Sequence, residues 1–545
     1  MKGTSKLIAL LIAAIMIVSV CACGGTESST TTTNQTTTQT QTQAPLEVPT
    51  TTVKEDPATL TTAADGEQPQ YGGTFRYWMY NICSGLNEVK NNRRDYMWPA
   101  IETLVRVNKA TNELTPMLAT SWEENAEEKS ITFHLREGVQ FHDGSPLNAE
   151  VVKWNYENMR AHGKGDVFYD AQVEVIDEYT VKAIFDEFHL DAVEIFADVG
   201  MYSKKAYDEL GEDGVLFNPV GTGPFVFSEF VTDTRVSYVR NDNYWQEGKP
   251  YLDGIDIYSI VDSDAAVTAF LNDEIDYFSA SSSTLIQRVE AEGFSNIAKQ
   301  SFYGNSVPCA VPNSRVEDDP FYNEEVRKAV FLYGIDWESF AALAGQGCAI
   351  AWHDLSVEGA LCYNPDVNAS FEYNPEKAKA MLAEAGYPDG FETTIHSGNV
   401  LLPVATALQA EFKKLGITAE VHRVNTSDTS MRDGVTPGVS CIPMDTSYDI
   451  MPTYTAKLRR VERTFGMNIT TTDKIEEYYA AAANATNYED RGVAGKKLVY
   501  QAIVEDCLFV PVYCLYTSIY LKPKVHDNNL CYNRMYVPEL IWIEQ

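Results

Sequence analysis

Helix followed at once by strand is the pattern that most constrains how this chain folds. Val404, Leu408 and Phe412 recur at helical spacing and mark the apolar face of a predicted helix. That helix ends at a glycine, and a predicted strand over residues 417–424 begins there. A second helix, predicted over residues 375–385, starts with a capping asparagine and a proline and also stops at a glycine. Repeated helix and strand units predict an α/β architecture.

The length of the chain predicts that this architecture is divided. At 545 residues the chain exceeds what one hydrophobic core usually serves, so we expect two or more lobes. Ile131, Phe133 and Leu135 alternate with polar residues, as in a half-buried strand. Residues 508–521 are apolar and aromatic and indicate a core strand near the end of the chain.

Charge excludes one class of partner. The formal net charge is −35, and a protein this acidic repels the phosphate backbones of nucleic acids. Two interpretations of the charge remain. We favour an acidic exterior that keeps the protein soluble, and the alternative is attraction of a cationic ligand.

The N-terminus has the features of an export signal. Lys2 and Lys6 precede an apolar run over residues 7–20. This run is too short to span a bilayer comfortably, and small residues follow it. We therefore predict a signal peptide over residues 1–22.

Cys23 is the predicted lipidation site. The sequence around it resembles a lipobox, with Ala22 as the small residue before the cut. Cys21 is the competing choice, but the bulky Val20 would then precede the cut. A plain secretory signal without lipid is the alternative. Since the rest of the sequence has no apolar stretch near the length of a membrane span, lipid is expected to hold the mature protein to its membrane.

Residues 23–70 form a predicted stalk. From residue 24 onward this stretch is dominated by Thr, Ser, Gln, Pro and Ala and has almost no large apolar side chains. Such a composition cannot bury enough surface to offset the entropy of ordering the chain. We expect a disordered, flexible stalk, with the folded body starting near Tyr71.

Two motifs resemble parts of catalytic or nucleotide sites and have plainer interpretations. His142, Asp143 and Ser145 are the residue types of a hydrolytic triad, but close neighbours in sequence do not easily form that relay. A turn is favoured there. Residues 221–225 lack the Gly-Lys-Ser/Thr triplet of a phosphate-binding loop, and a tight turn into a strand is favoured.

A third cluster concerns thiol and metal chemistry. Cys348, His353 and Asp354 are the residue types of a thiol hydrolase or a metal site. No second histidine stands at metal-ligand spacing, and the sequence has no CxxC and no HExxH. We therefore expect no metal, no cofactor and no catalytic residue.

The cysteines leave two interpretations open. Of the 10 cysteines, Cys21 leaves with the predicted signal and Cys23 is the predicted lipid site. An oxidising compartment favours a local disulfide between Cys348 and Cys362, and buried reduced thiols are the alternative. The eight cysteines whose pairing the sequence leaves open are Cys83, Cys309, Cys348, Cys362, Cys441, Cys507, Cys514 and Cys531.

A set of motifs in fixed order covers residues 72–527. The first are residues 116–122 (PMLATSW) and 131–147 (ITFHLREGVQFHDGSPL). The later ones are residues 221–225, 240–245, 326–329, 335–336, 373–378, 385–391 and 415–417. As an ordered set they resemble the peptide/nickel class of bacterial extracellular solute-binding proteins, family 5.

The resemblance implies a periplasmic-binding-protein-like fold of the large cluster-C type, in which two α/β lobes enclose a cleft. Lobe I would use residues 71–300 and return with residues 500–545, and lobe II would use residues 301–499. Residues 301–313 and the segment near Glu505 would form the crossovers. Lobe closure would sequester the ligand and present the closed shape to a permease.

The resemblance also implies candidate ligand-binding residues. An acidic residue of the second lobe typically pairs with the N-terminal ammonium of a peptide ligand, and this role carries over to Asp449. The tryptophan that usually precedes that aspartate is missing here, so the sequence departs from the family's peptide-binding pattern at this position. Tyr80, Tyr303, Trp352 and Tyr448 occupy positions of pocket aromatics, with core packing as the alternative for each.

The partners and the location are implied by the same resemblance. We expect a monomer that serves the permease subunits of an ABC importer, which has separate ATPase subunits. The protein would be lipid-anchored to the cell membrane, in the periplasm or on a Gram-positive cell surface. The expected cargo is a short peptide or a similar small organic solute. A metal chelate, a sugar or a signalling peptide are alternatives, and an extracellular hydrolase is the remote one.

Overall fold

The computed structural model describes most of the chain beyond its N-terminal segment. The described residues are 68–80, 85–86, 96–107, 113–162, 171–186, 190, 192–296, 298–301, 306–356, 358–424, 437–445, 448–453, 469–526 and 537–545. The predicted signal peptide, Cys23 and all but the last residues of the predicted stalk lie outside them. Within these ranges no helix is long and apolar enough to cross a membrane.

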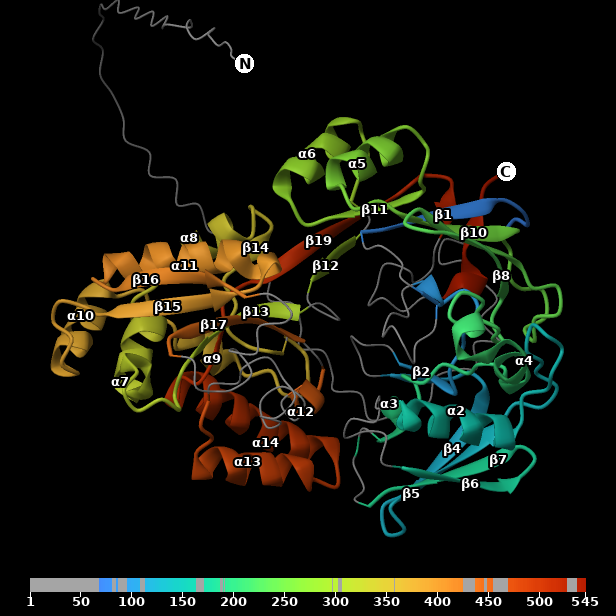
Figure 1. Cartoon of the computed structure of the whole chain (residues 1–545), viewed down its shortest axis with the longest axis horizontal. Coiled ribbons are helices and arrows are strands. Elements are labelled where there is room, and N and C mark those ends of the chain that lie inside the picture. Colours follow the sequence, from blue (N-terminus) through green and yellow to red (C-terminus); the bar gives the residue numbers. More distant parts are fainter. Residues whose placement is uncertain are drawn as a thin grey trace, which may run out of the picture. The chain divides into compact units, whose positions relative to one another are not determined.

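Buried apolar residues of the described chain form clusters that fall into two sets. Three clusters draw their residues from 75–289 and 519–543. Two further clusters draw theirs from 307–514. We call residues 306–514 the central region, and residues 68–301 with 515–545 the flanking region. Figure 1 shows both regions as mixtures of helices and strands.

The first sheet of the flanking region joins strands far apart in sequence. Its order is β1 (Thr74–Met79), β10 (Gly254–Ser259), β9 (Arg235–Arg240) and β8 (Phe225–Val231). β1 and β10 are parallel, and Phe75 is in register with Ile255. Both side chains are fully buried, because alternate residues of these strands face the core.

An antiparallel sheet covered by a helix forms a second part of the flanking region. The order is β4 (Ala119–Asn125), β5 (Ser130–Leu135), β7 (Thr180–Ile184) and β6 (Gln172–Asp177). β5 confirms the strand predicted from Ile131, Phe133 and Leu135, all of which are buried. Helix α2 (Ala149–Ala161) packs on β6 and β7 and begins where the Asn148 side chain accepts from the Val151 N–H.

Shorter elements complete the flanking region. They are β2 (Val105–Val107), β3 (Leu114–Pro116), α3 (Ala192–Ile195), α4 (Lys204–Val215), α5 (Ser263–Leu271), β11 (Tyr277–Ala280), α6 (Ser283–Ala291), β12 (Ala298–Ser301), β20 (Val525–His526), η8 (Pro538–Leu540) and β21 (Trp542–Ile543).

A five-stranded sheet organises the central region. Its order is β16 (Thr418–Arg423), β15 (Glu392–Ser397), β17 (Val439–Asp445), β13 (Ser306–Pro312) and β18 (Val510–Pro511). β15 runs parallel to both β16 and β17. Helix α11 (Leu402–Lys414) joins β15 to β16, which confirms the predicted helix followed by a strand.

Helices lie on both faces of this sheet. Val439 and Cys441 of β17 belong to one cluster with α11, whereas Ile442 and Met444 belong to the other, with α14 (Tyr488–Tyr500). The remaining elements are η3 (Pro320–Tyr322), α7 (Glu324–Lys328), η4 (Ala329–Tyr333), α8 (Trp337–Ala344), β14 (Ala349–Ile350), α9 (Pro365–Ala369), α10 (Pro375–Glu384), η5 (Asn399–Leu401), α12 (Ile450–Thr453), α13 (Asp473–Ala483) and η7 (Gln501–Glu505). The fold is thus mixed α/β, as the sequence predicts.

One strand pairs with elements of both regions. β19 (Cys514–Leu521) begins where Cys514 pairs with Ile350 of the central region. At its other end Leu521 pairs with Tyr277 of the flanking region, and β12 lies along its second edge. The red strand β19 can be followed from one region to the other in Figure 1.

Candidate functional site

The candidate ligand residues differ in exposure. Tyr80 follows β1 and is 55% exposed, and Trp352 is partly buried. Tyr448 and Asp449 are buried, with 7% and 4% of their surfaces exposed. Tyr303 lies outside the described residues. Only Tyr80 and Trp352 therefore offer accessible aromatic surface among the described candidates.

Asp449 is engaged within the chain. Its Oδ2 lies 2.5 Å from Nε of Arg491, a buried side chain of α14. Its Oδ1 accepts a hydrogen bond from the Met451 N–H at 2.9 Å. Because the carboxylate is shielded and already paired with an arginine, its negative charge is balanced inside the protein. The predicted contact with a ligand ammonium therefore requires Asp449 to exchange or share its partner.

Tyr448 is held beside Asp449. Its carbonyl accepts from the Leu361 N–H at 3.0 Å, and its ring packs in the central region. Burial raises the pKa of the Tyr448 hydroxyl, and nearby Cys362, Asp449 and Glu194 raise it further. Glu194 belongs to α3 of the flanking region, so Tyr448 lies where the two regions come close.

Trp352 forms an aromatic pair. Its ring stacks on Tyr363 with the centroids 5.7 Å apart and the planes 11° from parallel. Its Nε1–H donates to the Ser356 carbonyl at 3.2 Å, which fixes the orientation of the indole. The pair presents a planar, partly exposed surface of the kind that binds apolar or ring-shaped groups.

The neighbouring acid and histidine stabilise the loop that carries Trp352. Asp354 is fully buried and accepts from the N–H groups of Ser356 and Asn364 at 2.7 and 3.0 Å. Burial raises the pKa of Asp354 to about 7. Burial lowers the pKa of His353 to about 4, and its Nδ1 lies 2.8 Å from the Pro511 carbonyl. These contacts account for both residues without a thiol or metal chemistry.

The cysteines that the structure describes are buried and form no disulfides. This holds for Cys309, Cys348, Cys362, Cys441, Cys507 and Cys514. Of the two interpretations that the sequence leaves open, buried reduced thiols agree with the structure at these positions, and Cys348 and Cys362 form no disulfide with each other. Cys83 and Cys531 lie outside the described residues.

The motif His142, Asp143 and Ser145 forms a turn, as the sequence favours. Asp143 Oδ1 accepts from the Ser145 N–H at 2.9 Å, and its Oδ2 accepts from the Ser203 hydroxyl at 2.6 Å. Ser203 caps helix α4, so the aspartate ties the turn to a helix start. Gly144 has a φ of +75°, a conformation that glycine adopts without strain. His142 contacts the Gly223 carbonyl instead of Ser145.

Residues 221–225 form the predicted turn into β8. A Cβ on Gly221 or Gly223 would overlap the backbone of Ala100, so only glycine permits this close approach. The turn also brings Thr222 onto a carboxylate that the sequence did not single out. Glu102 accepts from the Thr222 hydroxyl at 2.8 Å and from the Tyr244 hydroxyl at 2.8 Å. Burial raises the pKa of Glu102 to about 7, although these hydrogen bonds and one from Trp245 oppose the rise.

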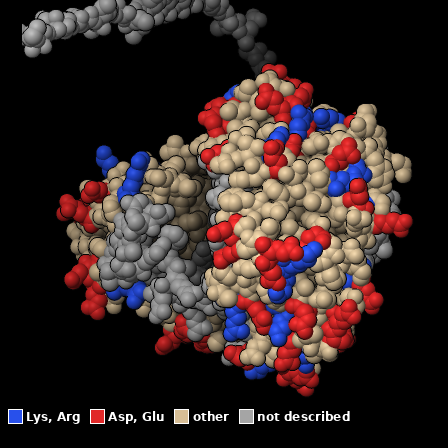
Figure 2. Space-filling view, turned by 45° about the vertical axis from the view of Figure 1, so that its right-hand side comes forward, with Lys and Arg blue, Asp and Glu red and all other residues tan. Residues whose placement is uncertain are grey.

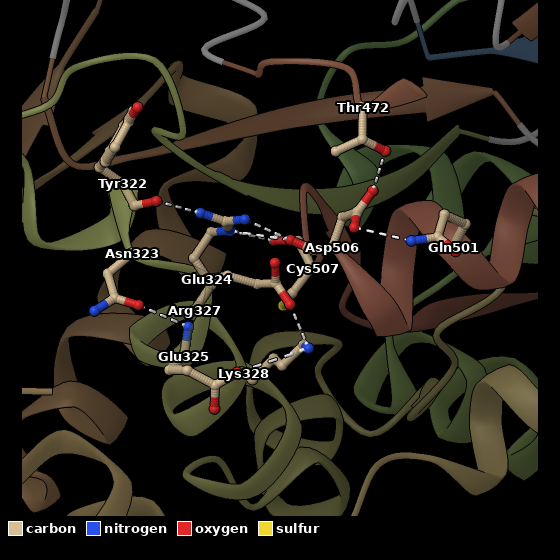
Figure 3. Close-up of polar contacts among 10 residues, drawn as sticks. All are labelled: Tyr322, Asn323, Glu324, Glu325, Arg327, Lys328, Thr472, Gln501, Asp506 and Cys507. Carbon is tan, nitrogen blue, oxygen red and sulfur yellow. Dashed lines mark hydrogen bonds and ion pairs between the residues drawn. The ribbon is translucent and has the colours of Figure 1, made fainter. Parts of the chain in front are cut away.

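A buried arginine joins the two ends of the central region. Arg327 of α7 is 4% exposed and donates to the Phe321, Tyr322, Asp506 and Cys507 carbonyls at 2.7–3.1 Å. Figure 3 shows its guanidinium between Tyr322 and the Asp506–Cys507 segment. Thr472 and Gln501 donate to the Asp506 carboxylate at 2.8 and 2.9 Å. The sequence places Arg327 in a motif but gives no sign of this role.

Surface charge follows the composition. Figure 2 shows acidic and basic side chains interspersed over the face in view, without a large basic patch there. Among the described residues no group of three or more His, Cys, Asp or Glu side chains could hold a metal ion. His396 and His422, whose Nδ1 atoms lie 3.2 Å apart, form a pair without a third such ligand.

Solved structures identify the fold. A periplasmic binding protein of Helicobacter pylori, named DppA and described as ABC transporter-associated and in complex with the peptide STSA, superposes with a TM-score of 0.71 and 21% identity. The match covers 87% of this chain and 99% of that one. The fold is therefore the mixed α/β fold of periplasmic binding proteins.

The family follows from the sequence. The model of the bacterial extracellular solute-binding proteins, family 5 (middle), matches residues 113–455, which is more than half of the chain. The chain belongs to this family. Family membership places the chain among extracellular solute-binding proteins.

Curated relatives carry different ligand names. Heme-binding protein A of Haemophilus influenzae is 30% identical over 361 residues, covering 58% of this chain and 62% of the relative. The dipeptide-binding protein of Escherichia coli is 27% identical over 361 residues, covering 59% of this chain and 66% of the relative. The matches thus span less than two thirds of these relatives.

Proposed function

We propose that the protein captures a short peptide or a similar small organic solute and delivers it to the permease of an ABC importer. The observation that carries this proposal is membership in family 5 over residues 113–455. The peptide in the complex of the Helicobacter pylori protein and the name of the dipeptide-binding relative support a peptide-like cargo. Energy for transport would come from separate ATPase subunits, and we propose that the protein acts as a monomer.

We propose that the central and flanking regions are two lobes that close on the solute. Their separate hydrophobic clusters support this, because each region buries its own apolar surface. Strand β19, paired in both regions, would act as part of the hinge. The sequence motifs suggest lobe boundaries at residues 300 and 499. Residues 502–514 pack in the central clusters, which supports a second boundary at about residue 514 instead.

We propose different roles for the candidate residues. Trp352, stacked on Tyr363, would contact the solute through its exposed face. Tyr80 would contribute a second aromatic surface, since more than half of it is exposed. Tyr448 and Asp449 would support the site, because both are buried and Asp449 pairs with Arg491. Tyr303 stays a sequence-based candidate.

We also propose that lipid on Cys23 anchors the protein. A signal peptide over residues 1–22 and a stalk over residues 23–70 would then place the folded body outside the membrane. One lipid chain alone gives weak attachment, so processing that adds more than one acyl chain is expected.

Titration calorimetry with a pool of synthetic tripeptides tests the cargo. We expect saturable binding, with mass spectrometry identifying the retained sequences. The Trp352→Ala variant should bind about tenfold more weakly, because an aromatic contact of this size is worth roughly 1–2 kcal/mol. Tyr373→Ala serves as the control, since Tyr373 is 50% exposed in the central region outside the candidate set.

A metal chelate is the second candidate cargo, favoured by the name of the haem-binding relative. Haemin, titrated under the same conditions, separates the two. If haemin binds and no peptide does, the cargo is a metal chelate and not a peptide. Absence of heat with peptides, haemin and simple sugars alike would contradict capture of a small solute of these classes.

A further inference from the structure

A side chain of the central region binds the flanking region at a point away from β19. The hydroxyl of Tyr488 donates to the carbonyl of Leu190 at 3.0 Å, across 298 residues of sequence. Tyr488 is the first residue of α14, and Leu190 lies two residues before Ala192, the first residue of α3. The contact therefore joins two helix starts that belong to different regions.

Helix α14 holds Tyr488 in a fixed position. Asn487 caps the helix by accepting from the Asp490 N–H at 2.9 Å. One turn further on, Arg491 is buried against Asp449. Gly495 packs so closely on Cys362 that a Cβ there would overlap the sulfur. Because the helix is fixed at its cap, at an ion pair and at a close approach, the Tyr488 ring has little freedom to move away from Leu190 without moving the whole helix.

The flanking side of the contact is also anchored. Ala192 and Val193 of α3 are buried in the core of the flanking region. Glu194 of the same helix lies near enough to Tyr448 to contribute to the raised pKa of the Tyr448 hydroxyl, after burial, Cys362 and Asp449. Two residues of the central region thus lie beside this part of the flanking region. Tyr488 bonds to the Leu190 carbonyl, two residues before α3, and Tyr448 lies near Glu194 within α3.

The strand pairing at β19 differs from this contact in kind. β19 continues through the covalent chain and pairs with β11, β12 and β14, so it stays joined whether the regions approach or separate. The bond between Tyr488 and Leu190 is one side-chain hydrogen bond, which breaks whenever α14 moves away from α3. A single bond of this type contributes a modest net free energy, enough to shift an equilibrium without locking it.

We propose that the Tyr488 hydroxyl is a latch that stabilises the closed arrangement of the two lobes by binding the Leu190 carbonyl. The latch rests on the proposed function, in that lobe closure is what it would bias. It acts through the protein's own groups and does not require the cargo to contact Tyr488. It would therefore raise the affinity for any cargo that selects the closed arrangement, by increasing the closed population.

Distances between spin labels test the latch in the mature protein without added cargo. Labels on Glu157→Cys of α2 and Lys474→Cys of α13 report the separation of the regions, since both native side chains are exposed. The buried native thiols resist labelling, because burial raises the pKa of thiols such as Cys362 and Cys507. Labelling of the native cysteines is measured in the parent protein, which lacks the two added cysteines.

Removal of the hydroxyl alone is the decisive change. In Tyr488→Phe we expect the ratio of long to short distances to rise about threefold to tenfold, the range that one net hydrogen bond supports. Tyr500→Phe is the matched control, because Tyr500 ends the same helix and is partly buried in the same cluster. It should leave the distance distribution unchanged.

Two outcomes overturn the latch. Either Tyr488→Phe gives the same distance distribution as the wild type, or Tyr500→Phe shifts it equally. A thermal melt of each variant verifies that the protein is folded before the distances are compared. Failure of the proposed function is separate: it would appear as absent solute binding in calorimetry, and the distances would still report whether the hydroxyl holds the regions together.

Discussion

Buried charged groups set the roles of individual residues in this protein. Asp449 is paired with Arg491, and Glu102 accepts hydrogen bonds from Thr222 and Tyr244. Both carboxyl groups are buried, so water cannot replace a hydrogen-bond or ion-pair partner that is removed by mutation. Stability measurements on these residues therefore separate a structural role from a ligand-binding role.

Asp449→Asn tests the role of the ion pair. The substitution leaves the buried Arg491 guanidinium without its counter-charge, so we expect the free energy of unfolding to fall by about 3–5 kcal/mol. Urea denaturation measures this. The double variant Asp449→Asn/Arg491→Met should be more stable than the single one, because it removes the unpaired charge. Unchanged stability together with lost peptide binding would instead show that Asp449 serves the ligand.

The raised pKa of Glu102 makes the stability of the fold depend on pH. Its pKa is raised from 4.5 in the unfolded chain to about 7 in the fold, so the folded protein binds the proton more tightly. The resulting stabilisation is fully present below pH 4.5 and is lost as the pH rises through 7. Relative to Glu102→Gln, the wild type should lose about 3 kcal/mol between these limits. Urea denaturation of both proteins at pH 5 and pH 8 measures the difference, and a constant difference would contradict the raised pKa.

Helix ends are the elements that tie distant parts of the central region together. The Arg327 guanidinium on α7 binds carbonyls at the end of η3 and just beyond η7. Since the last carbonyls of a helix have no partner within it, a buried cation is a favourable one. Figure 3 shows this junction from α7 to the Asp506–Cys507 segment.

Arg327→Met removes this junction while keeping much of the side-chain length. Several buried carbonyls then lose their donor, and we expect a loss of about 3 kcal/mol in the free energy of unfolding. Chemical denaturation followed by circular dichroism measures it. Arg315→Met is the control, because Arg315 is exposed and the same substitution there should cost under about 0.5 kcal/mol. Equal effects at both positions would contradict the junction.

Elements with strong local signals could be predicted from the sequence. The apolar spacing and the terminal residues of α10, α11 and β5 identify them without tertiary information. The distant partners of Arg327 and Glu102 could not be predicted. Thr222 lies 120 residues from Glu102, and Cys507 lies 180 residues from Arg327. Long-range pairing depends on topology, which local periodicity does not specify.

The candidate site shows the same limit. Family motifs pointed to Trp352 and Asp449, and the residue types at both positions suit ligand contact. The pairing of Asp449 with Arg491 and the stacking of Trp352 on Tyr363 depend on how α14 and the loop before α9 pack. Spacing in the sequence does not contain that information. The sequence left open whether Cys348 and Cys362 form a disulfide, because closeness in sequence does not show whether two thiols meet, and in the structure they are not bonded to each other.

At the scale of the whole molecule, two regions with separate cores are joined by β19. In the proposed function, a solute that binds residues of both regions would shift the equilibrium toward their approach, without any change in its own bonds. Membership in family 5 shows that the protein belongs to a family of solute-binding proteins. Lobe closure, as proposed, would present the bound state to a permease as a change of shape.

Native mass spectrometry of the protein purified from its own host tests whether it binds a small solute and leaves it chemically unchanged. We expect a complex with one small molecule per chain, whose mass after release equals its mass after prolonged incubation with the protein. Release by mild unfolding should return the molecule intact. A protein that carries no small molecule under any gentle purification, or one that converts its bound molecule into a product of different mass, would show that capture of an unchanged solute is not its function.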